Sequence, residues 1–458
     1  MTAKPTDHKL LSSMATILSE AEAKALLTKV LSYSKADECE VNISGEERGN
    51  IRYARNEVST SGSRTNQNLV VQSAFGKKVG TATIDEFDDA SLQKVVRRAE
   101  ELARLAPENP EYVSVLGPQT YLKANGFFPS TANLTPAARA EAVAKSLELT
   151  RAANLTAAGF MDDFRGYQAM MNSKGLFAYY PSTNVNFSLT VRTADGKGSG
   201  YVAKGYSDVA KLDTAAATRI AMQKAAASAD AKALEPGKYT VILEPTAAAV
   251  MLEQLFFSMD ARSADEGRSF LSKPGGKTKL GEKIVDSRVT IYSDPTNAEL
   301  PAAPWSGDGL PQPKNVWIDK GVVRNMAYSR YWAQKQGKQP VPFPNNLIMA
   351  GGTASLADLI KGTQRGILVT KLWYIRSVDP QTLLLTGLTR DGTFLIENGK
   401  IKHAVKNFRF NESPVIMLNN LETLGKPERV VSTESDSNYL IPPMKIREFT
   451  FSSLSDAV

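Results

Sequence analysis

The chain has 458 residues, a formal net charge of +7 and a hydrophobic content of 42%. Because a single core stops growing near about 250–300 residues, we expect two or three domains. The composition is that of an ordinary globular protein and excludes disordered, collagen-like and small disulfide-stapled chains. The charge excess is mild, and the densest basic stretch, 273–283, has no aromatic residue for base stacking, which argues against nucleic-acid binding.

Three features of the sequence bear on where the protein works. The longest apolar stretch, Ala247–Leu252, is far shorter than the ~20 residues of a membrane-spanning helix. Residues 1–19 are charged and lack an apolar run before a small-residue cleavage site, so they do not resemble a secretory signal. The single cysteine, Cys39, cannot form an internal disulfide and fits a reducing compartment. We expect a cytoplasmic protein with no membrane partner.

The first region, residues 1–110, is predicted to be an α+β domain. Ser19–Glu22 has the sequence of a capping box, and apolar residues at helical spacing follow it. Residues 39–84 change to short runs rich in Val, Ile and Thr that glycines divide, which is typical of antiparallel strands. A second amphipathic helix is expected over 91–106, where Pro107 ends it.

The central region, residues 111–235, is predicted to be a second α+β domain. Four prolines and little periodicity over 107–134 suggest a linker or a crossing segment before it. Thr135 and Pro136 predict the start of a helix to about Ala153. Alternating segments predict strands at 159–171, 176–180, 184–192 and 200–204, and an alanine-rich helix is expected over 214–233.

Short strands dominate the C-terminal region, residues 236–458, and predict a curved, mostly antiparallel sheet or barrel with a few helices. Asp319–Gly321 and Glu397–Gly399 have the sequences of hairpin turns. The stretches 301–313 and 340–344 are rich in proline and predict long ordered loops. Such loops are uncommon without a role such as lining a binding site. The predicted strands are 239–243, 289–292, 315–318, 322–328, 367–374, 382–388, 394–397 and 400–405, and the predicted helices are 246–259 and 355–361.

Few side chains in the sequence could bind a soft metal. The two histidines are His8, in the N-terminal tail, and His403, in the last region, while Cys39 lies in the first. A catalytic zinc site takes three protein ligands, mostly His, Cys or carboxylate. We therefore expect no self-contained zinc site, and a site built from carboxylates would suit Mg²⁺ or Ca²⁺ better.

Two other motifs bear on catalysis or anion binding. Gly196–Gly200 falls in a predicted hairpin instead of between a strand and a helix, so it does not indicate a phosphate loop. Ser199 lacks the spacing of a hydrolase nucleophile, and the one histidine after it is His403, which argues against a serine hydrolase. Ser355 with Asp358 indicates a helix N-cap, although amides at 351–356 could alternatively hold an anion or a peptide carbonyl.

Several stretches together resemble the TldD/PmbA family of zinc metallopeptidases over about residues 20–450. They are 50–58, 77–83, 235–243, 376–382, 387–392 and 396–401. The resemblance implies that the family's catalytic members bind zinc through His-Glu-x-x-x-His on a helix of the third domain and a later cysteine. The matching helix here reads Leu-Glu-Gln-Leu-Phe-Phe. Glu253 keeps the acid, but Leu252 and Phe257 stand where the histidines would be.

No cysteine occurs at 374–376, where the later ligand would fall, so the chain resembles the PmbA (TldE) partner type. The resemblance implies a subunit that holds no cofactor and joins a TldD-like zinc protease subunit into a heterodimer for unfolded peptides. The peptide would bind as an added strand. Leu252 and Phe257 would belong to a packed apolar helix face with Met251, Leu255, Phe256 and Met259. Glu253 would then be solvated or salt-bridged instead of acting as a general base.

Two alternative functions stay open at this point. The chain could be a homodimeric peptide-binding module without a catalytic role. It could also be an independent hydrolase with a carboxylate metal site, in which Glu253 is the candidate catalytic residue. The resemblance implies no particular substrate-binding residues.

Overall fold

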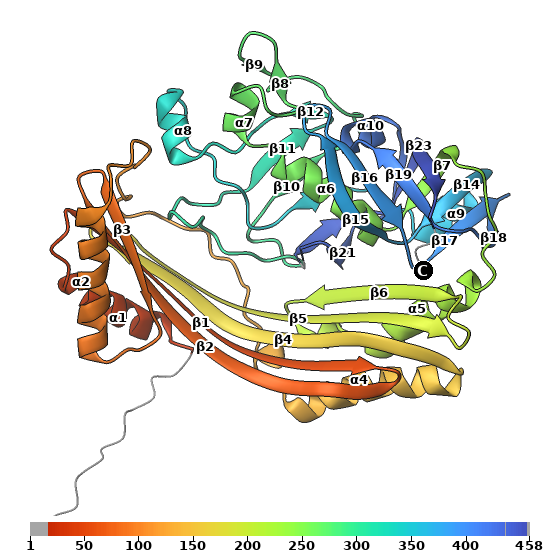
Figure 1. Cartoon of the computed structure of the whole chain (residues 1–458), viewed down its shortest axis with the longest axis horizontal. Helices are drawn as coiled ribbons and strands as arrows, with labels where there is room; N and C mark the ends of the chain where they lie inside the picture. Colours follow the sequence, from red (N-terminus) through yellow and green to blue (C-terminus); the bar gives the residue numbers. More distant parts are fainter. Residues whose placement is uncertain (1–16, 436, 456–458) are drawn as a thin grey trace, which may run out of the picture. The chain divides into compact units, whose positions relative to one another are not determined.

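The computed structural model describes residues 17–435 and 437–455, which form the mixed α+β structure that the sequence predicts (Figure 1). One compact unit comprises the described residues up to Arg48, together with Arg64–Gln119 and Arg165–Pro181. The other comprises Gly49–Ser63, Thr120–Phe164 and the described residues from Ser182 onward. Within the described part of the chain, no helix is both long and apolar enough to span a bilayer. Domain boundaries near 110 and 235 stay a prediction.

The first helices begin and end close to where the sequence predicts. Ser19 and Glu22 form the expected capping box at the start of α1 (Glu20–Ser32), and Asp88 caps α2 (Asp89–Leu105). Between them lie β1 (Glu38–Ala54), β2 (Glu57–Phe75) and β3 (Lys78–Ile84). The expectation that every glycine divides a strand is wrong. The strands run through Gly49, Gly62 and Gly80 and turn at Arg55–Asn56, where both residues have positive φ.

The strands of the first two regions form one six-stranded sheet in the order β3-β2-β1-β4-β5-β6. Its later strands are β4 (Leu155–Asn172), β5 (Phe177–Thr193) and β6 (Ser199–Tyr206), and the two strands predicted at 176–192 are the single strand β5. β3 pairs with residues 69–75 of β2, whereas residues 57–66 of β2 are all exposed.

The helices around these later strands agree with the sequence except at one end. Thr135 caps α4 (Pro136–Ala152), as predicted. Helix α5 (Thr214–Ser228) ends before the predicted residue 233. The short helices α3 (Pro129–Ala132) and η1 (Val209–Lys211) complete this part.

The C-terminal region confirms the predicted curved sheet. Its nine strands include the path β15-β16-β19-β23-β7-β14-β17-β18, which curls into a half-barrel and is antiparallel except where β14 pairs with β7. The strands of this sheet are β7 (Gly237–Leu243), β14 (Arg365–Val369), β15 (Leu372–Asp379), β16 (Leu384–Thr389), β17 (Thr393–Glu397), β18 (Lys400–Ala404), β19 (Phe408–Glu412), β20 (Leu421–Leu424) and β23 (Met444–Leu454). The single strand predicted at 367–374 is therefore two, β14 and β15.

Shorter strands and helices complete this region. A six-stranded sheet contains β10 (Ile291–Ser293), β11 (Asn315–Asp319), β12 (Val322–Val323), β13 (Ile348–Met349), β21 (Glu428–Val431) and β22 (Asn438–Ile441). β8 (Ser272–Lys273) pairs with β9 (Lys277–Thr278). The helices are α6 (Pro245–Phe257), α7 (Ala261–Asp265), α8 (Arg330–Lys335), α9 (Leu356–Lys361) and α10 (Pro414–Asn419). The strand predicted at 322–328 is limited to β12, while both predicted hairpin turns are present, with positive φ at Lys320 and Asn398.

Helix α6 lies inside the core of this region. Pro245 occupies its first turn, where the missing N–H costs no helical bond. Residues 247–252 are all fully buried, as are the neighbouring Val241 and Leu243 of β7. A helix that is apolar on nearly every side is expected to be buried. The core therefore holds the side chains of α6 before Phe257, except for the half-buried Thr246 and Gln254.

Candidate functional site

Helix α6 buries Glu253, the acid that the resemblance singles out. The residue is 2% exposed, and the Ser432 hydroxyl donates a 2.6 Å hydrogen bond to Glu253 Oε2. This corrects the expectation of a solvated or salt-bridged glutamate, because the partner of the carboxylate is a buried hydroxyl. The physical reason is that β21 and β22 pack against α6 where Glu253 lies, so its carboxylate must find a partner inside the core.

Tyr439, in β22, contributes a second hydroxyl near this carboxylate. Burial, together with the negative charge of Glu253, raises the pKa of Tyr439 to about 12. Tyr439 therefore keeps its proton at neutral pH and is a donor, not a metal ligand. The surroundings of Glu253 are built from protonated hydroxyls and hydrocarbon.

Leu252 and Phe257 have different environments on the same helix. Leu252 is fully buried, together with Met251, Leu255, Phe256 and Met259, which confirms the predicted apolar stripe. Phe257 is 59% exposed, so its predicted place on the packed face is wrong. At 3.6 residues per turn, a step of five residues rotates the side chain by about 140°, which carries Phe257 off the face of Leu252.

Tyr374 occupies the part of β15 where the resemblance places a cysteine. Its φ is +58°, in the left-handed region that a bulky residue rarely adopts. A register shift between Trp373 and Arg376 interrupts the pairing with β16, and the Tyr374 N–H donates a 3.0 Å bond to Glu434 Oε1. The ring is 47% exposed. Bulges of this kind re-aim a side chain away from the sheet.

The residues around Glu253 do not fit the zinc ion that the resemblance implies for catalytic members. Leu252 and Phe257 have no donor atom, while Ser432 and Tyr439 offer protonated hydroxyls. Zinc in proteins is held by thiolate, imidazole and carboxylate. Within residues 17–435 and 437–455, no group of three or more His, Cys, Asp and Glu side chains lies close enough to hold a metal.

The other described residues that the sequence singles out make contacts that do not involve Glu253. His8 lies outside the described residues. His403 is half-buried in β18, with Nδ1 2.8 Å from the Ala404 carbonyl oxygen. Burial raises the pKa of the Cys39 thiol, which leaves it a weak nucleophile. Ser355 and Asp358 form the predicted capping box of α9.

The two proline-rich stretches are ordered and lie side by side. The Gln312 amide donates a 2.6 Å bond to the Phe343 carbonyl, and Asn345 donates to the carbonyls of Ala303 and Trp305 at 2.9 and 2.7 Å. A groove of about 330 Å³ lies between residues 310–315 and 339–342. The prediction of ordered loops is confirmed, and a binding role for them stays a prediction.

A further buried polar cluster escaped the sequence analysis. Ser199 donates a 2.6 Å bond to Asp391 Oδ1, and Lys371 Nζ lies 2.9 Å from Oδ2. Asp391 is 4% exposed. Burial alone would raise its pKa, but Lys371, Ser199 and Arg390 outweigh burial and hold the pKa below its ordinary value. The local signal was the Asp-Gly pair, since Asp391 and Gly392 both have positive φ.

Comparison with known proteins gives consistent family matches along the chain. Models described as PmbA/TldA metallopeptidase domain 1, central domain and C-terminal domain match residues 39–103, 133–233 and 236–453. Two relatives named Metalloprotease, from Methanothermobacter thermautotrophicus and Archaeoglobus fulgidus, are 24% and 27% identical over 291 and 219 residues. The first alignment covers 58% of this chain and 62% of the relative, and the second covers 47% of each. The chain thus matches less than two thirds of the length of either relative.

A solved structure extends the likeness to the whole fold. The crystal structure of TldE from Thermococcus kodakarensis matches with a TM-score of 0.84 and 20% sequence identity. The match covers 94% of this chain and 99% of that one. At this identity the likeness concerns the fold.

Proposed function

Because the chain belongs to the TldD/PmbA family of metallopeptidases, we propose that it is the metal-free partner subunit of a heteromeric TldD/TldE-type zinc protease that acts on unfolded peptides. In this proposal a TldD-type subunit carries the zinc. The chain described here contributes binding surface to the assembly, and its role is in the proteolytic maturation or turnover of peptides in the cytoplasm.

The chemistry around Glu253 is the observation that carries the proposal. A glutamate that acts as general base in a metallopeptidase needs a metal-polarised water beside it. Here the Glu253 carboxylate bonds to Ser432 inside the core, and Leu252 fills the preceding position with hydrocarbon. Helix α6 thus serves the packing of the C-terminal region. The fold likeness to the TldE structure supports the same partner type.

An exposed sheet edge supports the handling of extended peptides. β15 is an end strand of the nine-stranded sheet. The Tyr374 N–H is bonded to Glu434, whereas residues 376–378 are exposed, Val378 by 55%. An extended peptide can pair with such an edge through main-chain hydrogen bonds, while exposed apolar residues contact its side chains. Main-chain pairing requires no particular peptide sequence, which suits unfolded substrates.

Co-expression tests the proposal directly. The chain is produced with a His-Glu-x-x-x-His homologue from the same genome, and we expect the two to co-purify, with one zinc per pair and cleavage of unfolded casein that needs both chains. The matched control replaces the motif glutamate of that homologue by glutamine, which should keep the complex and abolish cleavage. Failure to co-purify, together with unchanged cleavage by the homologue alone, contradicts the proposal.

The isolated chain distinguishes the two alternatives. One tightly held zinc per molecule, with casein cleavage that Glu253→Gln abolishes, would establish an independent hydrolase and overturn the proposal. A stable homodimer that binds unfolded peptide and ignores TldD-like chains would establish the binding module. Elemental analysis with a casein-cleavage assay tests the first alternative, and sedimentation equilibrium with a peptide-binding assay tests the second.

A further inference from the structure

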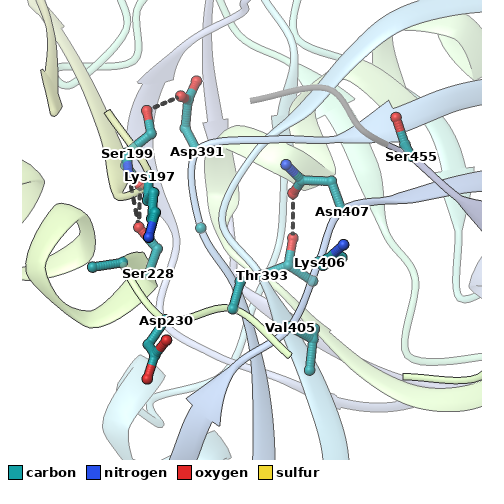
Figure 2. A pocket seen from close by; sticks show the side chains of 13 residues that line it. Lys197, Ser199, Ser228, Asp230, Asp391, Thr393, Val405, Lys406, Asn407 and Ser455 are labelled. Carbon is teal, nitrogen blue, oxygen red and sulfur yellow. Dashed lines mark hydrogen bonds between the residues drawn. The ribbon is translucent and has the colours of Figure 1, made fainter. Parts of the chain in front are cut away.

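A cavity of about 420 Å³ lies beside Asp391 and has no part in the proposed function (Figure 2). Its walls come from β6, the end of α5 and the residues that flank β17 and β18. The lining is largely polar and contains no aromatic side chain. Its size lies toward the lower end of the roughly 300–1,000 Å³ of small-molecule sites. The cavity therefore suits a small polar ligand that does not stack on aromatic rings.

The buried part of the cavity is polar. Lys371, whose ammonium lies 2.9 Å from the Asp391 carboxylate, and Arg390, 4.0 Å from it, balance the charge of Asp391. Thr393 donates a 3.1 Å bond to Asn407 Oδ1 beside it, and Figure 2 shows this pair across the pocket from Ser199. An ionised carboxylate has about four acceptor positions, so Asp391 can accept further bonds after those from Ser199 and Lys371.

The exposed part of the cavity separates two opposite charges. Asp230, just after α5, and Lys406, just after β18, are both exposed, and Figure 2 shows them on different sides of the pocket. Among the residues that the structure describes, neither side chain belongs to an ion pair. Lys197 also lines the cavity, but its ammonium lies 4.0 Å from Asp195. The exposed lining thus carries one carboxylate, Asp230, and two ammonium groups, of which, in the described part of the chain, only that of Lys197 has a carboxylate within 4.0 Å.

We infer that this cavity binds short peptides with both ends free, at the size of a dipeptide. The ligand's carboxylate lies toward Lys406 and its ammonium toward Asp230, while its amide bonds to the hydroxyls and the amide of the buried part. A simple anion would pair with the ammonium of Lys406, but the carboxylate of Asp230 would repel it. The inference is independent of the proposed function, because it rests on the charges and size of the cavity alone.

Calorimetric titration of the purified full chain with alanyl-alanine tests the inference, and acetyl-alanyl-alanine amide, which has neither charged end, is the comparison ligand. We expect binding of the free dipeptide and at least tenfold weaker binding of the blocked one, because hydrogen bonds to charged groups contribute about 1.5–3 kcal/mol. Lys406→Met and Asp230→Asn should each weaken binding about tenfold. Lys400→Met, at an exposed lysine at the start of β18 that does not line the cavity, should leave binding unchanged.

Three results would overturn the inference. The first is equal affinity for the free and the blocked dipeptide, and the second is no heat with either at millimolar concentration. The third is competition by inorganic phosphate that matches the dipeptide, which would show a plain anion site. Because the titration uses the isolated chain, its failure leaves the co-purification test of the proposed function unaffected.

Discussion

The Ser432 hydroxyl donates a 2.6 Å hydrogen bond to the Glu253 carboxylate, and both residues are only 2% exposed. The bond joins α6 to the residue that follows β21, and the hydroxyl of Tyr439 is the other polar group near the carboxylate. A buried carboxylate persists only where donors replace its lost hydration. Ser432 is therefore expected to be required for the stability of this region.

Replacing Ser432 by alanine removes this donor and leaves the carboxylate under-satisfied. We expect the free energy of unfolding to fall by about 1–3 kcal/mol. Urea unfolding followed by circular dichroism measures the change. The matched control is Ser453→Ala at an exposed position of β23, which should stay within about 0.5 kcal/mol of the parent. Equal changes in the two variants would show that the bond to Glu253 contributes nothing.

The buried pair Lys371–Asp391 should be strongly coupled. The two side chains are 12% and 3% exposed, so removing either one leaves a buried charge without its partner. We expect Lys371→Met and Asp391→Asn each to lower the free energy of unfolding by about 3–5 kcal/mol, and the double variant to lose much less than the sum.

A surface pair provides the reference for this double-mutant cycle. Lys145 and Glu141 form an i,i+4 pair with side chains 58% and 69% exposed. Their coupling energy should be far smaller than that of the buried pair, because solvent screens two exposed charges. A coupling as small as this for Lys371 and Asp391 would show that burial does not strengthen their interaction.

The lowered pKa of Glu38 predicts that the free energy of unfolding falls in acid. Burial alone would raise its pKa, but Lys174 and the donors Ser114, Tyr112 and the Val115 N–H together hold the pKa at about 2, below the usual 4.5. Because the folded pKa is the lower one, this contribution is complete above pH 4.5 and is lost as the pH falls toward 2.

Urea midpoints measured across this pH interval test the contribution of Glu38. Glu38→Gln should be less stable than the parent at neutral pH and should show a smaller decline in acid. Glu101→Gln, at an exposed position of α2, should keep the decline of the parent. A Glu38→Gln curve that runs parallel to the parent curve would exclude Glu38 as a source of the decline.

Gly80 allows α2 to pack closely on β3. A Cβ at this position would lie 2.2 Å from the Ala103 nitrogen and 2.3 Å from the Ala99 carbonyl oxygen, and both are backbone atoms. We expect Gly80→Ala to lower the free energy of unfolding by about 1–3 kcal/mol, because a backbone must shift to admit the methyl group. Gly62→Ala has no atom within 4 Å of the new methyl and serves as the control, with a change within about 0.5 kcal/mol. Equal melting temperatures would exclude a steric role for Gly80.

The sequence predicted those parts of the fold that depend on neighbouring residues. The capping boxes Ser19–Glu22 and Ser355–Asp358 and the turns before Gly321 and Gly399 are local signals, and all four were predicted. The single strand predicted at 367–374 was wrong, because Thr370 and Lys371, which separate β14 from β15, include no Gly or Pro to mark the break. A break of two residues in the strand hydrogen bonding changes the composition too little to be predicted from the sequence.

The site was harder to predict because its contacts join distant parts of the chain. Glu253 and Ser432 are 179 residues apart, and Ser199 and Asp391 are 192 apart. The sequence singled out Glu253, but its burial follows from elements that pack on all sides of α6. No local pattern records such a pairing, so the hydroxyl partner could not be predicted.

The exposed residues 57–66 of β2 limit how this chain can be redesigned. Among the described residues, β3 pairs only with residues 69–75 of β2, which leaves residues 57–66 without a partner on that side. Five of these ten residues carry a hydroxyl, and Val58 is the one aliphatic member. Polarity at such a margin keeps separate molecules from stacking into fibrils. Changing Ser59, Ser61 and Ser63 to isoleucine would supply the β-branched, uncharged stretch from which amyloid grows, although it would leave every interior contact intact.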